Sequence, residues 1–321
     1  MSAWKLLQLT AACGVAIGAL TAGAHAQSTG SWVMKAPLPA ALSEVGVAYA
    51  AGKVHVFGGS VLGVTGPYHQ EYDPATDKWR PRSPFPRSLD HVGSAVLNGK
   101  IYTMGGFVGG SVHKDGQNSA FEYDPALDTW RILAPMKAGR GSVSVVALDG
   151  KIHAIGGRDP AGTTVGTHEV YDPATNTWKD LAPFPKPRDH MAATVINGEI
   201  HIAGGRFGAS TDKTNLHDSY DPKTNTWTAG APLPTARSGL AGTYYKGLFM
   251  VLGGENPPTG TNPENEAYDA KTEKWLTLAP MPGGRHATAA VTDGDHVYLA
   301  GGSLTPGGAG ATNQLIVFTL P

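Results

Sequence analysis

Cysteine is almost missing from this chain. The only one among 321 residues is Cys13, close to the N-terminus. The rest of the chain can therefore form no internal disulfide, no thiolate metal ligand and no cysteine nucleophile. Charge is also scarce, since Asp, Glu, Lys and Arg make up 16% of the residues, with 25 basic against 26 acidic side chains. So neutral a chain has no overall field to attract nucleic acid, and we expect no such partner.

Long apolar runs are missing everywhere except at the N-terminus. Lys5 precedes a mostly apolar run over 6–20, and Ala24-His25-Ala26 forms the A-x-A pattern of a cleavage site. We therefore expect residues 1–26 to be a secretory signal cleaved after Ala26, and residues 27–321 to be one domain in the periplasm or outside the cell.

A lipoprotein acylated at Cys13 is the alternative, but Thr10 stands where a leucine is expected and the apolar run continues past the cysteine. No other stretch approaches the ~18 apolar residues of a membrane-spanning helix, so we expect no transmembrane segment.

Glycine and proline, in contrast, are abundant. The 43 glycines and 24 prolines are about 21% of the chain, against roughly 12% in average proteins. That density of helix breakers argues against helical bundles and doubly wound α/β folds. Because 41% of the residues are hydrophobic and only 16% are charged, disorder is not expected either.

One motif recurs six times. An alternating apolar stretch ends in Gly-Gly, a Tyr-Asp-Pro box follows, and a tryptophan comes seven residues after the tyrosine. Turn dipeptides such as Asn98-Gly99 precede the Gly-Gly strands, as tight hairpins require. The first glycines of the pairs are Gly58, Gly105, Gly156, Gly204, Gly253 and Gly301. The tryptophans are Trp32, Trp79, Trp130, Trp178, Trp227 and Trp275.

This motif at a period near 50 residues resembles the kelch repeat, in which each copy is one four-stranded propeller blade. The resemblance spans residues 31–320 and implies an all-β fold, a six-bladed kelch β-propeller. The sixth repeat ends without a tryptophan after Phe318, whereas Trp32 matches Trp275. We therefore predict that the N-terminal strand closes the last blade, in a 3+1 arrangement.

Length variation is confined to one class of loop. Each tryptophan precedes the next Gly-Gly by 26 residues in all six cases, whereas the gaps from Gly-Gly to the tyrosine box hold 12, 16, 13, 14, 13 and 15 residues. Variation restricted to one loop class is typical of a binding face. We expect the ligand at the end of the propeller that carries these loops.

Arginine recurs on that face. Ten residues after the tryptophan, four repeats carry Arg140, Arg188, Arg237 and Arg285. Arg158, Arg206 and Glu255 follow directly after Gly-Gly pairs. Converging guanidinium groups suit a carboxylate, so these residues predict a funnel for an anion. The alternative is that each of the four arginines bonds nearby carbonyls and only fixes the chain crossing.

The segment 236–242, ARSGLAG, resembles animal kelch proteins, in which arginines at this repeat position hold acidic peptides. The resemblance therefore implies binding by those four arginines. A polar position five residues before the tyrosine box lines the same pocket in that family. Three repeats match it here, with Asn118, Asn215 and, five before Phe318, Asn313, whereas the others carry Pro67, Gly166 and Pro263.

Histidines are numerous, but we expect no metal and no cofactor, because the sequence has no HExxH motif and no other close His/Glu grouping. His91 and His190 stand out because each follows an aspartate, twelve residues after a tryptophan, and an Asp-His pair can orient an imidazole for proton transfer. The two lie two blades apart, so their meeting is left open.

Three functions remain. The first is an exported, monomeric propeller that binds an anionic partner, either an acidic peptide or a sugar acid. The second is a mutarotase, since secretion and six blades are similar to the periplasmic sialic-acid mutarotases; Glu255 matches that family's catalytic glutamate, but Thr261 replaces its arginine. The third is a non-catalytic scaffold in the cell envelope. Galactose oxidase activity is excluded, because it needs a cysteine cross-linked to a tyrosine.

Overall fold

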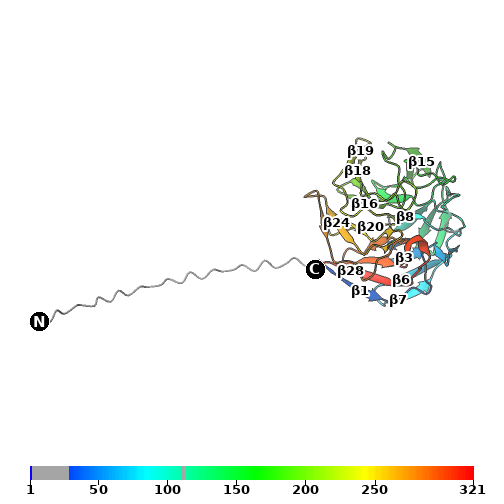
Figure 1. Ribbon diagram of the computed structural model, residues 1–321. Coiled ribbons are helices and arrows are strands. Elements are labelled where there is room, and N and C mark those ends of the chain that lie inside the picture. Colours follow the sequence, from blue (N-terminus) through cyan, green and yellow to red (C-terminus); the bar gives the residue numbers. More distant parts are fainter. Residues whose placement is uncertain (2–28, 110–112) are drawn as a thin grey trace.

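The computed structural model describes Met1 and residues 29–109 and 113–321. The expected signal segment therefore lies outside the described residues. Six four-stranded antiparallel sheets surround a central axis (Figure 1). This is the six-bladed β-propeller that the repeats predict, and we number the blades in chain order.

In each blade the first strand is innermost and the fourth is outermost. Blade 1 contains β2 (Gly46–Ala50), β3 (Lys53–Phe57), β6 (His69–Asp73) and β7 (Lys78–Pro81). Blade 2 contains β8 (Gly93–Leu97), β9 (Lys100–Met104), β10 (Ala120–Asp124) and β11 (Thr129–Ile132). Blade 3 contains β12 (Ser144–Leu148), β13 (Lys151–Ile155), β14 (His168–Asp172) and β15 (Thr177–Asp180). Blade 4 contains β16 (Ala192–Ile196), β17 (Glu199–Ala203), β18 (His217–Asp221) and β19 (Thr226–Ala229). Blade 5 contains β20 (Ala241–Tyr245), β21 (Leu248–Leu252), β24 (Asn265–Asp269) and β25 (Lys274–Thr277).

Blade 6 joins the two ends of the chain. Its strands are β26 (Ala290–Thr292), β27 (Val297–Ala300), β28 (Leu315–Thr319) and the N-terminal β1 (Ser31–Lys35). In Figure 1, β1 lies beside β28, with which it pairs antiparallel.

Short additional elements lie in the variable loops. They are the ribbons β4 (Ser60–Val61) with β5 (Val64–Thr65) and β22 (Glu255–Asn256) with β23 (Gly260–Thr261), and the short 3₁₀ turn η1 (Pro306–Gly308).

The Gly-Gly pairs end the second strands because a side chain has no room there. Gly105 has a φ of +69°, and a Cβ on it would lie 2.1 Å from the carbonyl oxygen of Arg140 in the following connection. Only glycine tolerates both the left-handed backbone and this close approach. The repeated glycines thus let each blade pack against the chain that enters the next one.

The six tryptophans link neighbouring blades. Each indole N–H donates to a backbone carbonyl in the connection that leaves the preceding blade, as from Trp130 to Ser83 at 3.1 Å and from Trp32 to Ala279 at 2.9 Å. The rings also pack against apolar side chains of the cores between blades. The expectation that tryptophan packs between blades is confirmed.

Six of the eleven histidines in the described residues belong to the packing between the second and third strands. In blades 1, 3 and 4 the two strands each contribute one buried imidazole, and the paired rings are hydrogen-bonded at 3.0–3.1 Å. In each pair the second ring lies within hydrogen-bond distance of a backbone carbonyl, which fixes its tautomer. The pairs are His55 with His69, His153 with His168, and His201 with His217.

These pairs predict acid sensitivity. Burial lowers the pKa of His69, His153 and His217 to about 4, whereas unfolded histidines titrate near 6.5. Between pH 6.5 and about 4 the unfolded chain takes up protons that the folded chain does not, so the free energy of unfolding falls as the pH falls, by up to about 1.4 kcal/mol per unit for each histidine. Urea unfolding at pH 7 and pH 5 measures this, and equal midpoints would contradict it.

Among the described residues, no helix is long and apolar enough to cross a membrane.

Candidate functional site

A cavity of about 370 Å³ lies among the variable loops, at the end of the propeller where the sequence predicts binding. We call it the funnel cavity. Residues of the loops that follow the second strands line it, together with residues of the connections that enter the blades. Its lining is Ser43, Glu44, Ser60, Leu62, Gly63, Asp90, His91, His113, His190, Arg206, Glu255, His286 and 307–309.

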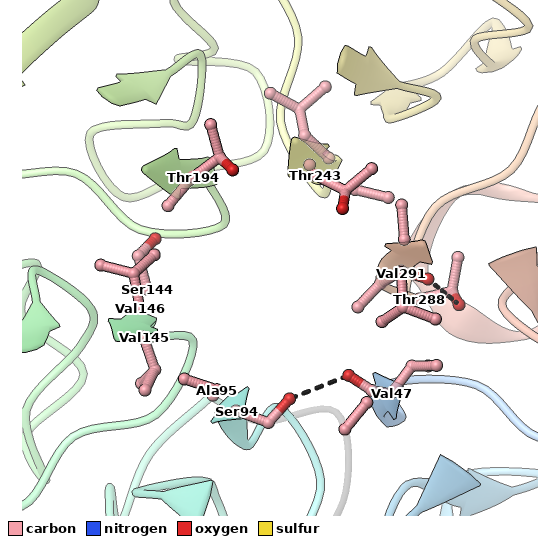
Figure 2. A pocket seen from close by; sticks show the side chains of 18 of the residues that line it. Val47, Ser94, Ala95, Ser144, Val145, Val146, Thr194, Thr243, Thr288 and Val291 are labelled. Carbon is pink, nitrogen blue, oxygen red and sulfur yellow. Dashed lines mark hydrogen bonds between the residues drawn. The ribbon is translucent and has the colours of Figure 1, made fainter. Parts of the chain in front are cut away.

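An axial channel of about 460 Å³ lies next to the funnel cavity, between the innermost strands. Figure 2 shows small apolar and hydroxyl side chains from these strands around the channel, including Val47, Ser94, Thr194 and Thr243. Glu44, His91 and His190 line both spaces. These three side chains therefore stand at the junction of cavity and channel.

The junction is built from one repeat position. The residue twelve positions after each tryptophan has a left-handed backbone, with φ between 53° and 69°. Backbone hydrogen bonds join neighbouring members around the axis, as from the His91 N–H to the Glu44 carbonyl at 3.0 Å and from Ser142 to His91 at 3.1 Å. We call these six residues the inner ring. They are Glu44, His91, Ser142, His190, Gly239 and Ala287.

The inner ring brings His91 and His190 together, which the sequence left open. Their ring centroids lie 5.1 Å apart, and His113 from the loop of blade 2 lies 4.7 Å from His91 and 5.1 Å from His190. The expectation that no close histidine grouping exists is therefore corrected. It failed because histidines that are far apart in the chain meet on the axis.

Each ring histidine is oriented by the aspartate before it. His91 Nδ1 lies 2.6 Å from an Asp90 carboxylate oxygen, and His190 Nδ1 lies 2.5 Å from one of Asp189. Both aspartates are buried. Because a carboxylate accepts the Nδ1 proton, each Nε2 is left for another partner. His91 Nε2 lies 2.8 Å from a Glu44 oxygen, and His190 Nε2 lies 2.9 Å from Arg206 Nη2.

The two ring histidines have opposite charge preferences. Burial would lower the pKa of His91, but the nearby Glu44 and Asp90 carboxylates outweigh it and raise that pKa to about 10. For His190, burial and the Arg206 guanidinium lower the pKa to about 4. At neutral pH, His91 is an imidazolium and His190 a neutral imidazole.

Arg206 and Glu255 complete the cavity wall. The Arg206 guanidinium bonds the carboxylates of Asp189 and Glu255, and its Nη2 lies 2.9 Å from His190 Nε2. The Gly307 N–H donates to the other oxygen of Glu255 at 3.1 Å. Arg206, Glu255, His91 and His190 are the predicted binding residues that line the cavity.

The four arginines ten residues after tryptophan do not line it. In Arg237, Nη1 donates to the Gly253 carbonyl at 2.7 Å and Nη2 to the Glu266 carboxylate at 2.6 Å. Each guanidinium is turned into its own blade and is at most 1% exposed. The prediction that they form a cationic arc in the funnel is therefore corrected. The alternative of bonding to nearby carbonyls holds for Arg140, Arg237 and Arg285, whereas Arg188 donates to the Asp218 carboxylate. These residues are Arg140, Arg188, Arg237 and Arg285.

Four further predicted residues also lie outside the cavity lining. Arg158 pairs with Asp189 at 2.9 Å. The three asparagines five residues before the tyrosine box offer their backbone carbonyls to N–H groups of the connections, as Asn118 does to Met136 at 2.9 Å. The expected pocket lining by these asparagines is therefore corrected as well. They are Asn118, Asn215 and Asn313.

Sequence reasoning missed several residues of the site. Glu44 occupies the same repeat position as His91, so its place was readable from the spacing. His286, one position earlier in its own repeat, was readable in the same way. His113 has no counterpart in the other repeats, since it lies in the longest variable loop, and no spacing pointed to it.

Comparison with known proteins agrees with the fold. Kelch-like protein 35 of Mus musculus is 32% identical over 133 residues, and that of Homo sapiens is 47% identical over 133 residues. These segments cover 41% of this chain but only 22% and 21% of the relatives, so the chain spans about a fifth of their length.

The solved structure of YjhT superposes with a TM-score of 0.73 at 17% identity, over 88% of this chain and 96% of that one. At this identity the likeness shows the fold alone. The model of the KLHDC2/KLHL20/DRC7 Kelch-repeats domain matches residues 95–302. Since that match covers well over half of the sequence, the chain belongs to the Kelch-repeat family.

Proposed function

We propose that this propeller binds a small, hydroxyl-rich acid, such as a sugar acid, in the funnel cavity. The observation that carries the proposal is the convergence of cationic groups and oxygen acceptors on one space. The cavity volume, about 370 Å³, lies within the range of small-molecule sites.

Two groups can hold the carboxylate of such a ligand. The His91 imidazolium and the Arg206 guanidinium both line the cavity. Arg206 has five N–H donors, of which three are directed at Asp189, Glu255 and His190, so the fork has donors left for a ligand oxygen. Charge-assisted bonds of this kind are the stronger class.

The remaining lining suits hydroxyl groups better than a second anion. Glu44, Asp90 and Glu255 add negative charge to the wall, and the hydroxyls of Ser43 and Ser60 lie 3.3 Å apart on it. Carboxylates accept hydrogen bonds from sugar hydroxyls but repel further carboxylates. With the four blade arginines buried, an acidic peptide is the poorer candidate.

The test is a binding series measured by calorimetry and thermal unfolding. A sialic acid at 100 times its dissociation constant should stabilise the fold by roughly 2.7 kcal/mol. The matched neutral sugar and an acidic peptide should not. Arg206→Lys should weaken binding about tenfold or more, because the fork is lost. Arg158→Lys is the control, since Arg158 also pairs with Asp189 but lies outside the lining.

Equal binding of the acid and the neutral sugar would contradict this proposal. Binding of the peptide without binding of the sugar acid would replace it.

We also propose that export places the cavity outside the cytoplasm, in which case the secreted protein should begin at Gln27.

A second candidate, sugar-acid mutarotase, is favoured by one observation. Mutarotation needs one group to donate a proton and another to accept it, and the environments of His91 and His190 push their pKa values apart. These two are better placed than Glu255, whose oxygens are held by Arg206 and Gly307. Anomer exchange followed by proton NMR should then be accelerated by the protein and lose that acceleration in His190→Asn.

A further inference from the structure

The three histidines at the mouth of the channel have the spacing of a ligand set. His91 Nε2 and His113 Nε2 lie 3.2 Å apart, and the candidate ligand atoms of His91, His113 and His190 all lie within 4.8 Å of one another. Zinc–nitrogen bonds of about 2.0–2.1 Å place tetrahedral ligand nitrogens about 3.3–3.4 Å apart. The first pair is within about 0.2 Å of this separation, and the third nitrogen must move closer by rotation of its imidazole ring.

The surroundings of two of these histidines match those of metal ligands. Metal-bound histidines almost always donate the other ring N–H to a carboxylate or a carbonyl. His91 and His190 have this arrangement through Asp90 and Asp189, at 2.6 and 2.5 Å. An Asp-His dipeptide at equivalent positions of two blades thus brings two Nε2 atoms close together, and loss of the His91 Nε2 proton frees both as ligands.

A fourth ligand is within reach. A Glu44 carboxylate oxygen lies 2.8 Å from His91 Nε2, and Glu44 belongs to the same inner ring. We propose that His91, His113 and His190 bind a divalent transition-metal ion, such as zinc, with the Glu44 carboxylate as the fourth ligand. Imidazole and carboxylate are the donors such ions accept, and no thiolate is needed.

The hydrogen bonds of these side chains are compatible with replacement of a proton by a metal ion. A proton on His91 Nε2 bridges toward Glu44, and the metal ion takes the place of that proton. Arg206 gives up its contact with His190 Nε2 but keeps the carboxylates of Asp189 and Glu255. The ion then lies between the channel and the funnel cavity, facing the space where a ligand carboxylate binds. With the ion bound, His91 is no longer an imidazolium, and the ion supplies the positive charge that the imidazolium supplies without it.

The test uses the tag-free chain, equilibrated with zinc and dialysed, with metal content and zinc calorimetry as readouts. Cobalt(II) is the spectroscopic probe, because its visible spectrum reports tetrahedral coordination. We expect one zinc ion per chain. Removing a ligand in His113→Asn should abolish retention, and Asp90→Asn should weaken affinity about 10–100-fold.

His296→Asn is the matched control, since His296 is an exposed histidine outside both the cavity lining and the three-histidine cluster. It should bind zinc like the wild type. Failure of the wild-type chain to retain zinc would overturn the proposal, as would unchanged binding by His113→Asn. Anomer exchange in chelated protein that stops on adding zinc would support zinc binding at these histidines. It would also assign them to proton transfer in the chelated protein, because a metal-bound Nε2 carries no proton.

Discussion

Arg237→Ala is expected to lower the free energy of unfolding by about 3–5 kcal/mol, the cost of breaking a buried ion pair. The substitution leaves the buried Glu266 carboxylate without its guanidinium partner. It also removes the N–H donors of the Gly253, Val251 and Glu264 carbonyls, which are bonded at 2.7, 3.2 and 3.0 Å. Urea unfolding followed by tryptophan fluorescence measures the change.

Lys137→Ala is the control for charge removal. Lys137 pairs with Asp180, but both side chains are about half exposed or more, so the loss should not exceed about 1 kcal/mol. If Arg237→Ala unfolds at the same urea concentration as Lys137→Ala, Arg237 does not stabilise the fold. The prediction that it binds an anion in the funnel would then stand again. Arg140 has the same partners in blade 3 and should behave like Arg237.

These arginines show where spacing stops being informative. The repeat fixes that Arg140, Arg188, Arg237 and Arg285 stand at one position of the blade. It does not fix the direction of a long side chain, which can reach either a cavity or its own backbone. Here each blade offers a buried acceptor to its arginine, because buried acceptors without partners are costly. The acceptor is a Gly-Gly carbonyl for Arg140, Arg237 and Arg285, and the Asp218 carboxylate for Arg188. The guanidinium groups therefore turn inward.

The fold itself was readable because it repeats. Gly-Gly, tyrosine and tryptophan each occupy a position that geometry allows few other residues to fill, as the 2.1 Å approach at Gly105 shows. Six copies of this motif are compatible with one architecture, the six-bladed propeller. Half of the site was readable for the same reason, since Glu44, His91 and His190 share a repeat position.

The other half of the site was not readable from the repeat. His113 reaches the axis from a loop without counterparts, so neither periodicity nor spacing locates it. The meeting of His91 and His190 depends on the narrowing of the propeller toward its axis. Blades that are two apart at the rim are in contact at the inner ring, where the imidazole centroids lie 5.1 Å apart.

Removing the N-terminal strand should destabilise the whole propeller. A chain that begins at Ala36 lacks β1, whose five residues pair with β28 from Ser31–Thr319 to Lys35–Leu315. It also lacks the Trp32 indole, which packs 5.0 Å from the Phe318 ring and bonds the Ala279 carbonyl across the gap to blade 5. Deleting a packed tryptophan alone costs about 3–5 kcal/mol, and the strand pairing adds to this.

The loss should spread beyond blade 6, because β1 covers an edge that is otherwise open to pairing with other chains. We therefore expect a lower melting temperature, concentration-dependent aggregation and a loss of cooperativity in the truncated chain. The matched comparison is Met34→Ser, an exposed position in the middle of the same strand, which leaves the backbone pairing and Trp32 in place and should change little. Melting of the truncated chain at the temperature of the intact one would show that five blades and an open sixth sheet hold together unaided. The pairing of β1 with β28 would then contribute nothing to closure.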